Sequence, residues 1–284
     1  MRAYVPANAA RNSQYVKMIE KGYSDIMTEN NNTRKPSTGA ATRQVMLKSY
    51  IEEDYSVKES YKALRTNIQF CGDDVKVISV TSCMPNEGKS TTALELCKSL
   101  AELGKKVLLI DADLRKSVLA SKYADRSGIE GLSQFLSGQA TLQDVLYSTQ
   151  YPNFYIIFSG AFPPNPVELL SKDKFADFLA NAKNTFDYIL IDCPPLGNVI
   201  DAAVVSRFCD SAILVILANM VSAKFARSVK AQLEKSGCRI LGVILNNADK
   251  KSGRYYKRYY NRYYNRYYNK YYKKYSGYYA DEQK

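Results

Sequence analysis

The stretch Cys83-Met-Pro-Asn-Glu-Gly88-Lys89-Ser90-Thr91 decides the fold of this chain. It follows an apolar run, Val75–Thr81, and leads into a segment with helical periodicity, Ser90–Leu103. Its second half is the Gly-Lys-Ser ending of a phosphate-binding loop, although Cys83 stands where that motif has its first glycine. A glycine lets the backbone approach a phosphate, and main-chain N–H groups at a helix N-terminus form a positive concave surface. The strand before the loop and the helix after it favour a nucleotide site.

Two acidic motifs accompany the loop. One is Val107-Leu-Leu-Ile-Asp111-Ala-Asp113-Leu-Arg115, and the other is Tyr188-Ile-Leu-Ile-Asp192-Cys-Pro-Pro195. Each places carboxylates at the end of an apolar, strand-like run, where parallel sheets bind ligands. Magnesium prefers oxygen ligands, so Ser90, Asp111 and Asp192 are expected to hold Mg²⁺, some of them through water. Lys89 is expected to reach the β- and γ-phosphates of ATP.

The residues assigned to chemistry and to nucleotide binding fall into two overlapping sets. The predicted catalytic residues are Lys89, Asp111, Asp113 and Asp192. The predicted nucleotide contacts are Asn86, Glu87, Gly88, Lys89, Ser90, Thr91, Arg115 and Asn246.

Apolar runs alternate with helical patterns from about residue 53 to residue 249. The remaining expected strands are Lys106–Asp111, Tyr155–Ser159, Tyr188–Asp192, Ala212–Leu217 and Arg239–Asn246. The remaining expected helices are Pro166–Ala182, Asp201–Phe208 and Ser222–Ser236. Continuous apolar strands separated by helices indicate a mostly parallel sheet that is covered on both faces. The fold class is therefore α/β, a P-loop NTPase.

Three regions are expected along the chain. Residues 1–52 are rich in Asn, Ser and Thr and are predicted to be a polar extension or linker. Residues 53–250 are the P-loop domain, and residues 251–284 are a tyrosine-rich basic tail that is expected to be disordered. Of the net charge of +12, the part from Lys250 onward carries 11 Lys or Arg and 2 Asp or Glu, which gives +9. The basic character therefore belongs to the tail rather than to the body.

Composition excludes several kinds of chemistry. The chain has no histidine, which removes Ser–His and Cys–His nucleophiles and the commonest zinc ligand. Its six cysteines show no metal-ligand spacing and are expected to be reduced core thiols. No apolar run reaches the ~20 residues of a membrane-spanning helix, and the N-terminus lacks a signal-peptide pattern. A cytoplasmic location is expected, unless a partner recruits the chain to a membrane.

The tail decides between nucleotide hydrolysis and phosphoryl transfer, which share this machinery. It contains 13 tyrosines within the 25 positions 255–279, interleaved with basic residues. These candidate acceptors are Tyr255, Tyr256, Tyr259, Tyr260, Tyr263, Tyr264, Tyr267, Tyr268, Tyr271, Tyr272, Tyr275, Tyr278 and Tyr279. A phenol has a pKa near ~10, so a nearby carboxylate helps its attack; Asp113 is the candidate base and Asp111 the alternative. Binding of single-stranded nucleic acid and an amphipathic membrane helix are the less favoured readings of the tail.

The combination of the phosphate loop, the Asp-x-Asp strand, the Asp-x-Pro-Pro strand and the tyrosine cluster resembles the bacterial tyrosine kinase family. The likeness is to the separate cytoplasmic kinase subunit of capsule or exopolysaccharide export systems, over about residues 53–284. Glu59, Lys62 and Arg65 resemble the family's Glu-x-x-Arg-x-x-Arg oligomerisation motif, with Lys62 in place of its first arginine. The segment Pro163–Leu170 resembles a loop beside the family's active site.

The resemblance implies a deviant Walker A fold and an autokinase that uses ATP and Mg²⁺. It also implies a ring of copies in which one subunit's tail enters its neighbour's site. The expected partners are a membrane-embedded polysaccharide co-polymerase or adaptor that activates the kinase, and a cognate tyrosine phosphatase; no nucleic acid is expected. The alternative is a positioning ATPase of the ParA/MinD type without kinase activity. Those proteins have a signature lysine five residues before the loop lysine, where this chain has Met84.

Overall fold

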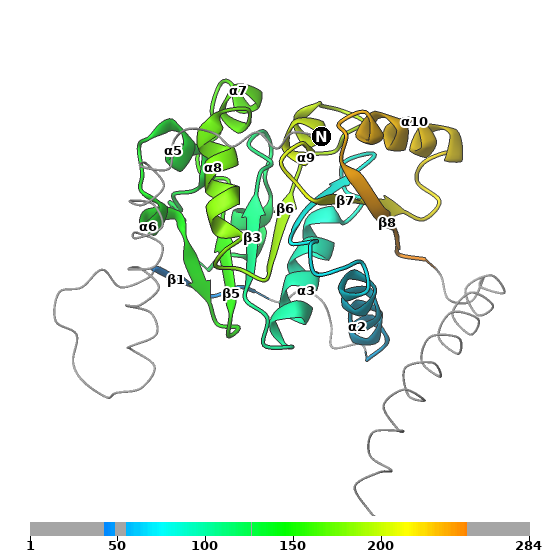
Figure 1. The fold of residues 1–284 in the computed structure, drawn as a ribbon, viewed down its shortest axis with the longest axis horizontal. Helices are drawn as coiled ribbons and strands as arrows, with labels where there is room; N and C mark the ends of the chain where they lie inside the picture. The colour runs from blue at the N-terminus through cyan, green and yellow to red at the C-terminus, as the bar shows by residue number, and fades with distance from the viewer. Residues whose placement is uncertain (1–42, 49–54, 126, 249–284) are drawn as a thin grey trace, which may run out of the picture. The chain divides into compact units, whose positions relative to one another are not determined.

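Apolar runs that end in a carboxylate form the centre of an eight-stranded sheet (Figure 1). The computed structural model describes residues 43–48, 55–125 and 127–248. The strands are β1 (Arg43–Val45), β2 (Val77–Ser82), β3 (Val107–Asp111), β4 (Tyr147–Thr149), β5 (Phe154–Ile157), β6 (Tyr188–Asp192), β7 (Ser211–Leu217) and β8 (Arg239–Asn246). Their order in the sheet is β1-β4-β5-β3-β6-β2-β7-β8. Every pair is parallel except β4 with β5, so the expectation of a mostly parallel sheet is confirmed.

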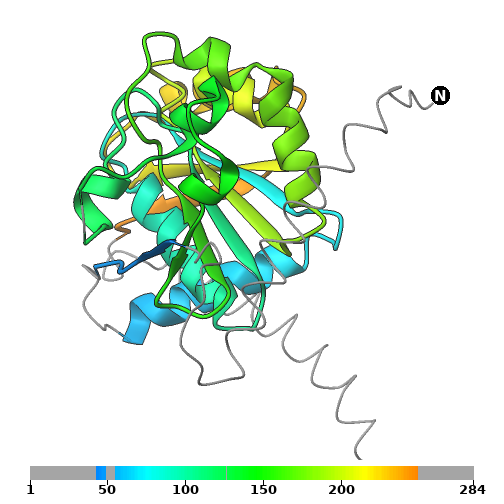
Figure 2. The same ribbon diagram turned by 90° about the vertical axis from the view of Figure 1, so that its left-hand side faces the viewer.

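Helices cover both faces of this sheet (Figures 1 and 2). They are α2 (Tyr55–Gln69), α3 (Lys89–Ala101), α4 (Leu119–Tyr123), α5 (Leu132–Ser137), α6 (Leu142–Val145), α7 (Pro166–Leu170), α8 (Asp173–Ala182), α9 (Asp201–Ser206) and α10 (Ala223–Glu234). Side chains of β3 alternate between two cores: Leu108 and Ile110 pack in the cluster that contains α8, and Leu109 packs in the cluster that contains α3. Burial on both faces explains why the strand has no polar alternation in its sequence.

Two expectations about the elements need correction. Residues 43–48 lie in the segment expected to be a linker, yet β1 pairs with β4, and Val45 and Leu47 are buried. These apolar side chains complete the second core, so this short piece belongs to the fold. The single helix expected over Pro166–Ala182 is two helices, because the backbone of Lys172 is extended (φ −70°, ψ 148°) and cannot continue α7.

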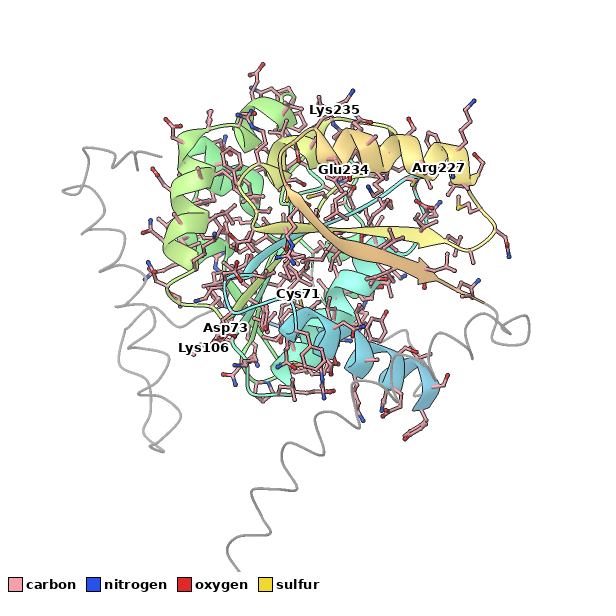
Figure 3. The ribbon with its side chains drawn as sticks, turned by 45° about the vertical axis from the view of Figure 1, so that its right-hand side comes forward. Cys71, Asp73, Lys106, Arg227, Glu234 and Lys235 are labelled. Atoms are coloured by element: carbon pink, nitrogen blue, oxygen red, sulfur yellow. The ribbon has the colours of Figure 1, made fainter. Side chains whose placement is uncertain are left out.

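The topology brings the expected site residues to one edge of the sheet. The loop after β2 and the ends of β3 and β6 share this edge, and Asp111 pairs in register with Asp192 across β3 and β6. Cys71, Asp73 and Lys106 lie at the opposite, amino edge of the strands (Figure 3). The site is therefore built where neighbouring parallel strands end.

The cysteines are placed as the sequence predicts, except that Cys71 and Cys209 are only partly buried. All six cysteines are free thiols, and Cys83, Cys97, Cys193 and Cys238 are buried. In the part of the chain that the structure describes, no helix is both long enough and apolar enough to cross a bilayer.

A truncation in the first core is expected to be costly. Phe175 is fully buried on α8, and its ring meets that of Phe208 edge to face, with 6.1 Å between centroids. Phe175→Ala should lower the free energy of unfolding by about 3–5 kcal/mol, through lost apolar contact and a residual cavity. Phe162 is 60% exposed and provides the control. Phe162→Ala should lower the free energy of unfolding by less than about 1 kcal/mol. Urea denaturation measures both; equal losses would contradict the assignment of Phe175 to the core.

Candidate active site

The phosphate loop is shaped by two residues in the left-handed region. Gly88 has φ 85° and ψ 16°, and Asn86 has φ 65°. A Cβ on Gly88 would lie 2.2 Å from Nδ2 of Asn246, at the end of β8. Glycine is therefore required here both for its backbone angle and for the close approach of a neighbouring strand.

Glu87 and Asn246 hold this loop in place from within. Glu87 is fully buried, and its carboxylate accepts hydrogen bonds from the backbone N–H of Met84 (2.6 Å) and of Leu217 (3.2 Å). The Asn246 side-chain amide donates to the carbonyl oxygen of Glu87 at 2.9 Å. In this structure both side chains build the loop, so the part of Glu87 that is left for a nucleotide is its backbone.

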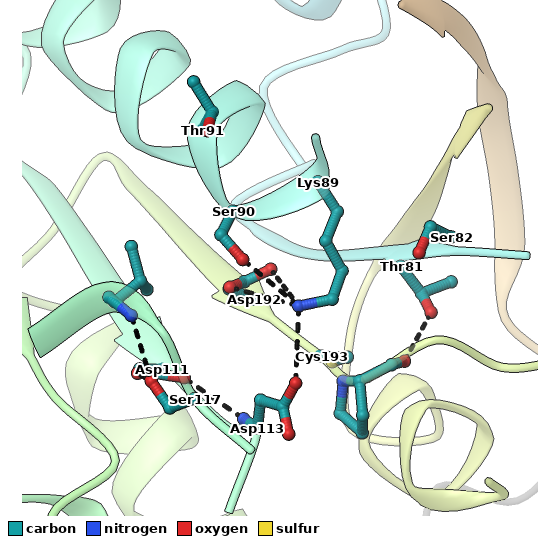
Figure 4. A network of polar contacts seen from close by, with 12 residues as sticks. Thr81, Ser82, Lys89, Ser90, Thr91, Asp111, Asp113, Ser117, Asp192 and Cys193 are labelled. Atoms are coloured by element: carbon teal, nitrogen blue, oxygen red, sulfur yellow. Dashed lines mark hydrogen bonds and ion pairs between the residues drawn. The ribbon is translucent and has the colours of Figure 1, made fainter. Parts of the chain in front are cut away.

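Lys89 stands at the centre of the site (Figure 4). Its Nζ lies 3.3 Å from Oδ1 of Asp192 and 3.5 Å from Oδ2 of Asp113. The Ser90 hydroxyl is 3.2 Å from the same Nζ. All four side chains come from segments that end or begin at the same sheet edge, and each residue is at most 9% exposed. The structure thus brings Lys89, Ser90, Asp113 and Asp192 together, as the sequence predicts.

Asp111 is the most enclosed of the carboxylates. One of its oxygens accepts the Asp113 backbone N–H at 3.2 Å, and the other accepts the hydroxyl of Ser117. Asp113 differs, because its Oδ1 accepts only the Lys116 backbone N–H (3.0 Å) while its Oδ2 faces Lys89. Asp111 thus has both oxygens occupied, whereas one oxygen of Asp113 is directed at the site.

Burial and charge together shift the ionisation of this cluster. Burial, with the neighbouring Asp192, raises the pKa of Asp111 to about 8. Burial also raises the pKa of Asp192, although Lys89 and Ser90 oppose this. Burial disfavours the ammonium of Lys89, but Asp192, Asp113 and Asp111 more than offset it, so the pKa of Lys89 is raised. The shifts have one cause: three carboxylates crowd around a single cation in a site shielded from water.

The residues present fit a divalent cation. With every group ionised, three carboxylates and one ammonium leave two negative charges uncompensated. Within the described ranges, no group of three acidic or cysteine side chains is arranged to hold a metal ion by itself. Mg²⁺ commonly keeps several waters and takes phosphate oxygens alongside one or two protein ligands. Ser90, Asp111 and Asp192 remain the predicted ligands.

Other predicted residues have partners elsewhere in the fold. Arg115 donates from Nε and Nη2 to the two oxygens of Asp201, at 2.8 and 3.1 Å. The Thr91 hydroxyl lies 2.7 Å from the hydroxyl of Tyr123. The structure therefore shows Arg115 and Thr91 in contacts within the protein, and their contact with a nucleotide stays a prediction.

The predicted oligomerisation residues lie on α2. Lys62 pairs with Glu59 at 2.7 Å, on the surface of the helix. Arg65 donates to the Ser99 carbonyl oxygen at 2.6 Å and lies 3.4 Å from Glu102, so it fastens α2 to the end of α3. Its role between subunits stays a prediction, as does that of Glu59 and Lys62. The candidate acceptor tyrosines of the tail lie outside the described residues.

The structure adds three residues that the sequence did not single out. The Ser117 hydroxyl donates a hydrogen bond to Asp111, and Asp201 forms an ion pair with Arg115. The hydroxyl of Tyr123 is hydrogen-bonded to that of Thr91. Asp201 is fully buried at the start of α9. Acidic residues are common at helix starts, so its position in the sequence is only a weak indication of a role in the site. No sequence motif identifies Ser117 or Tyr123 as site residues.

Gly88→Ala is expected to disrupt the loop. The new methyl group would meet Asn246 and would be held at a positive φ, so nucleotide affinity should fall by about tenfold or more. The double variant Gly88→Ala with Asn246→Ala removes the steric contact and should recover part, but not all, of the affinity. Titration with a fluorescent ATP analogue measures this; full affinity of the single variant would refute the geometric requirement.

Comparison with known proteins places this geometry in a family. A family model described as an AAA domain matches residues 75–240. The chain is 41% identical over 214 residues to tyrosine-protein kinase CpsD of Streptococcus agalactiae serotype III (strain NEM316), which covers 75% of this chain and 92% of that protein.

Two solved structures are similar to the fold. The kinase domain of Escherichia coli tyrosine kinase ETK matches with a TM-score of 0.66 and 29% identity, over 79% of this chain and 87% of that one. The septum site-determining protein MinD of Pyrococcus horikoshii OT3, complexed with Mg-ADP, matches with a TM-score of 0.52 and 31% identity, over 62% and 73% of the two chains. The fold is therefore that of a P-loop NTPase of the MinD kind, and the extent of the kinase match shows that this chain belongs to the bacterial tyrosine kinase family.

Proposed function

We propose that this chain is a protein-tyrosine kinase that transfers the γ-phosphate of ATP to tyrosines in the C-terminal tail of a neighbouring copy. The observation that carries the proposal is the position of Lys89 Nζ, within 3.5 Å of Ser90, Asp113 and Asp192 at the mouth of the phosphate loop. The tail supplies 13 tyrosines as acceptors. The relationship to proteins named tyrosine-protein kinases supports this choice over a positioning ATPase.

Each residue of the cluster has a proposed role. Backbone N–H groups of residues 86–91 bind the phosphates, and Lys89 stabilises charge that develops on them in the transition state. Ser90 and Asp192 would hold Mg²⁺ directly and Asp111 through water, since both Asp111 oxygens already accept hydrogen bonds, and the ion would shield the phosphate charges. Asp113 takes the phenol proton of the acceptor, because one of its oxygens is directed at the site while both oxygens of Asp111 are engaged.

The family resemblance supports the wider setting of the reaction. Copies assemble into a ring through α2, with Glu59, Lys62 and Arg65 at or near the contact. A membrane-embedded adaptor of a capsule or exopolysaccharide system activates the kinase and holds it at the inner face of the membrane. A cognate tyrosine phosphatase reverses the modification, and the cycle regulates polysaccharide synthesis and export.

A mixing experiment tests transfer between copies. A Lys89→Met chain with an intact tail would be the acceptor. A chain with a functional Lys89 and its 13 tail tyrosines changed to serine would be the enzyme. The two are combined with labelled ATP and the adaptor, and phosphoamino-acid analysis follows. Phosphotyrosine on the Lys89→Met chain is the expected result. If wild-type protein became phosphorylated on tyrosine but the Lys89→Met chain did not, transfer would occur within one copy. If ATP were hydrolysed steadily and neither protein contained phosphotyrosine, a positioning ATPase would be favoured.

Heavy phosphorylation is expected to loosen the oligomer. Each phosphate adds about −1.5 to −2 charges, so about five would offset the tail charge, which is +9 from Lys250 onward. Attraction between the basic tail and a neighbour's acidic, ATP-occupied site should then be lost. Analytical ultracentrifugation of phosphorylated and phosphatase-treated protein measures this. Identical masses for the two forms would contradict it.

A further inference from the structure

A buried tyrosine is hydrogen-bonded to the helix that follows the phosphate loop. The hydroxyl of Tyr123, in α4, lies 2.7 Å from that of Thr91, in the first turn of α3 (Figure 4). Tyr123 is 1% exposed and packs among the apolar side chains of the second core. A buried tyrosine hydroxyl needs a hydrogen-bond partner. Here that partner stands only two residues after Lys89, so a residue of the core is joined to the turn on which the nucleotide site depends.

The orientation of this first turn matters for phosphate binding. The N–H groups in the first turn of a helix have no acceptor within the helix, and after a phosphate loop they point at the bound phosphate. In α3 the N–H of Thr92 donates to the carbonyl oxygen of Gly88 at 2.8 Å. Residues 89–91 therefore precede the first helical hydrogen bond, and a side-chain contact at Thr91 can fix the direction of their N–H groups.

Tyr123 can hold the turn because its own backbone is fixed. Its carbonyl oxygen accepts the N–H of Lys48 at 2.8 Å, and the residue after it pairs with Leu47 in an antiparallel β-bridge. The side chain of Gln150 holds Leu47 in turn: it accepts the Leu47 N–H at 2.8 Å and donates to the Leu47 carbonyl oxygen at 2.7 Å. Residues 43–48, which the sequence assigns to a linker, thus anchor the residue that reaches the phosphate helix.

The segment that ends in Tyr123 also contacts the carboxylates of the site. The Lys116 N–H donates to Asp113 at 3.0 Å, and the Ser117 hydroxyl donates to Asp111. One connection, from the end of β3 to the end of α4, therefore bonds to the acidic cluster near its start and to the phosphate helix at Tyr123. The two halves of the candidate site are joined through it.

From these contacts we infer that Tyr123 is a positioning residue for the nucleotide: through the Thr91 hydroxyl it holds the first turn of α3 in the orientation that binds phosphate. The inference rests on the proposed function, because it takes the phosphate loop to be the ATP site. It gives a role in that site to a core residue that no motif marks, and to the N-terminal segment that anchors this residue. Since Tyr123 acts through Thr91, its effect is expected on the affinity for ATP.

Hydrogen exchange of the full chain without nucleotide, followed by NMR, tests whether the bond holds the turn. Tyr123→Phe keeps the ring and removes the hydroxyl, so the Thr92 amide should exchange about three- to tenfold faster, as expected for the loss of one hydrogen bond. The Glu102 amide, hydrogen-bonded just beyond the other end of α3, should keep its rate. Tyr147→Phe is the matched control: Tyr147 is 2% exposed in the same core and donates its hydroxyl to a backbone carbonyl at 3.2 Å. It should change neither rate.

Affinity for ATP, titrated with a fluorescent analogue, is the second measurement. Tyr123→Phe and Thr91→Val break the same bond, and each should raise the Kd by about threefold or more. The double variant should bind about as weakly as the weaker of the two single variants, because no further bond is left to lose. Thr91→Ser keeps the hydroxyl and should stay within about twofold of the wild type, and Tyr147→Phe should leave the Kd unchanged.

Three results would overturn the inference: an unchanged Thr92 exchange rate in Tyr123→Phe, losses of affinity that multiply in the double variant, or an equal loss in Tyr147→Phe. Failure of the kinase proposal looks different. If the wild-type chain bound no ATP, the proposed function itself would fail. If it bound ATP and phosphorylated its tail while Tyr123→Phe bound ATP as tightly as the wild type, the kinase would stand and only the role of Tyr123 would be lost.

Discussion

Lys89→Met should abolish tyrosine phosphorylation of the tail, with a rate at least about 10³-fold below that of the wild type. Lys89 is the cation at the centre of the cluster, 3.3 Å from Asp192 and 3.5 Å from Asp113. Methionine keeps most of the side-chain length but supplies no charge to the transferring phosphoryl group, and preorganised charge is the largest contribution to such reactions. Mass spectrometry of the purified variant, incubated with ATP, Mg²⁺ and the adaptor, measures the phosphotyrosine that remains.

The control for this substitution is Lys224→Met, which removes an exposed lysine of α10. It should phosphorylate its tail at the wild-type rate. Both variants should keep the wild-type circular dichroism spectrum, because the Lys89 side chain contacts polar groups of the site rather than the apolar core. Phosphotyrosine on Lys89→Met protein, made without any other kinase present, would end the assignment of Lys89 as the residue that stabilises the transition state.

Asp113→Asn should lower the rate of phosphoryl transfer by about 10²–10³-fold and leave nucleotide affinity within a few-fold of the wild type. The amide keeps the size of the carboxylate and can still accept the Lys116 backbone N–H, but it cannot take a proton from a phenol. General-base contributions of this size are typical. Single-turnover transfer from labelled ATP gives the rate, and binding of a fluorescent ATP analogue gives the affinity.

Asp177→Asn, on the exposed side of α8, is the matched control for Asp113→Asn and should have no effect. Phosphate transfer at the full rate by Asp113→Asn would rule out Asp113 as the base and leave Asp111 as the remaining candidate.

The local sequence was sufficient for most of the central sheet. The expected bounds of β6 and β8 agree with the structure, and those of β2, β3, β5 and β7 differ by one or two residues at one or both ends. Strands β2, β3, β6 and β7 were predictable because burial on both faces makes the whole segment apolar, whereas β8 is apolar in sequence although it lies at the sheet edge with several exposed residues. The exceptions are β1 and β4, each three residues long, because so short a strand shows no period and is fixed by its partner.

The residues of the candidate site also differ in how far the sequence predicts them. Lys89, Asp111 and Asp192 could be placed together from the sequence, because each stands at the carboxyl end or the loop of a parallel strand, and such ends share an edge.

The amino-acid sequence alone determined the class of fold, the phosphate loop and the carboxylates that face it, since these depend on residues within one strand–loop–helix unit. Only the tertiary structure decided that Glu87 builds the loop, that Arg115 binds Asp201 and that Arg65 fastens α2 to α3. Those contacts join residues 34 to 130 positions apart. Several acceptors suit each of these side chains equally well on chemical grounds, and the packing of the sheet and its helices selects which one lies within reach.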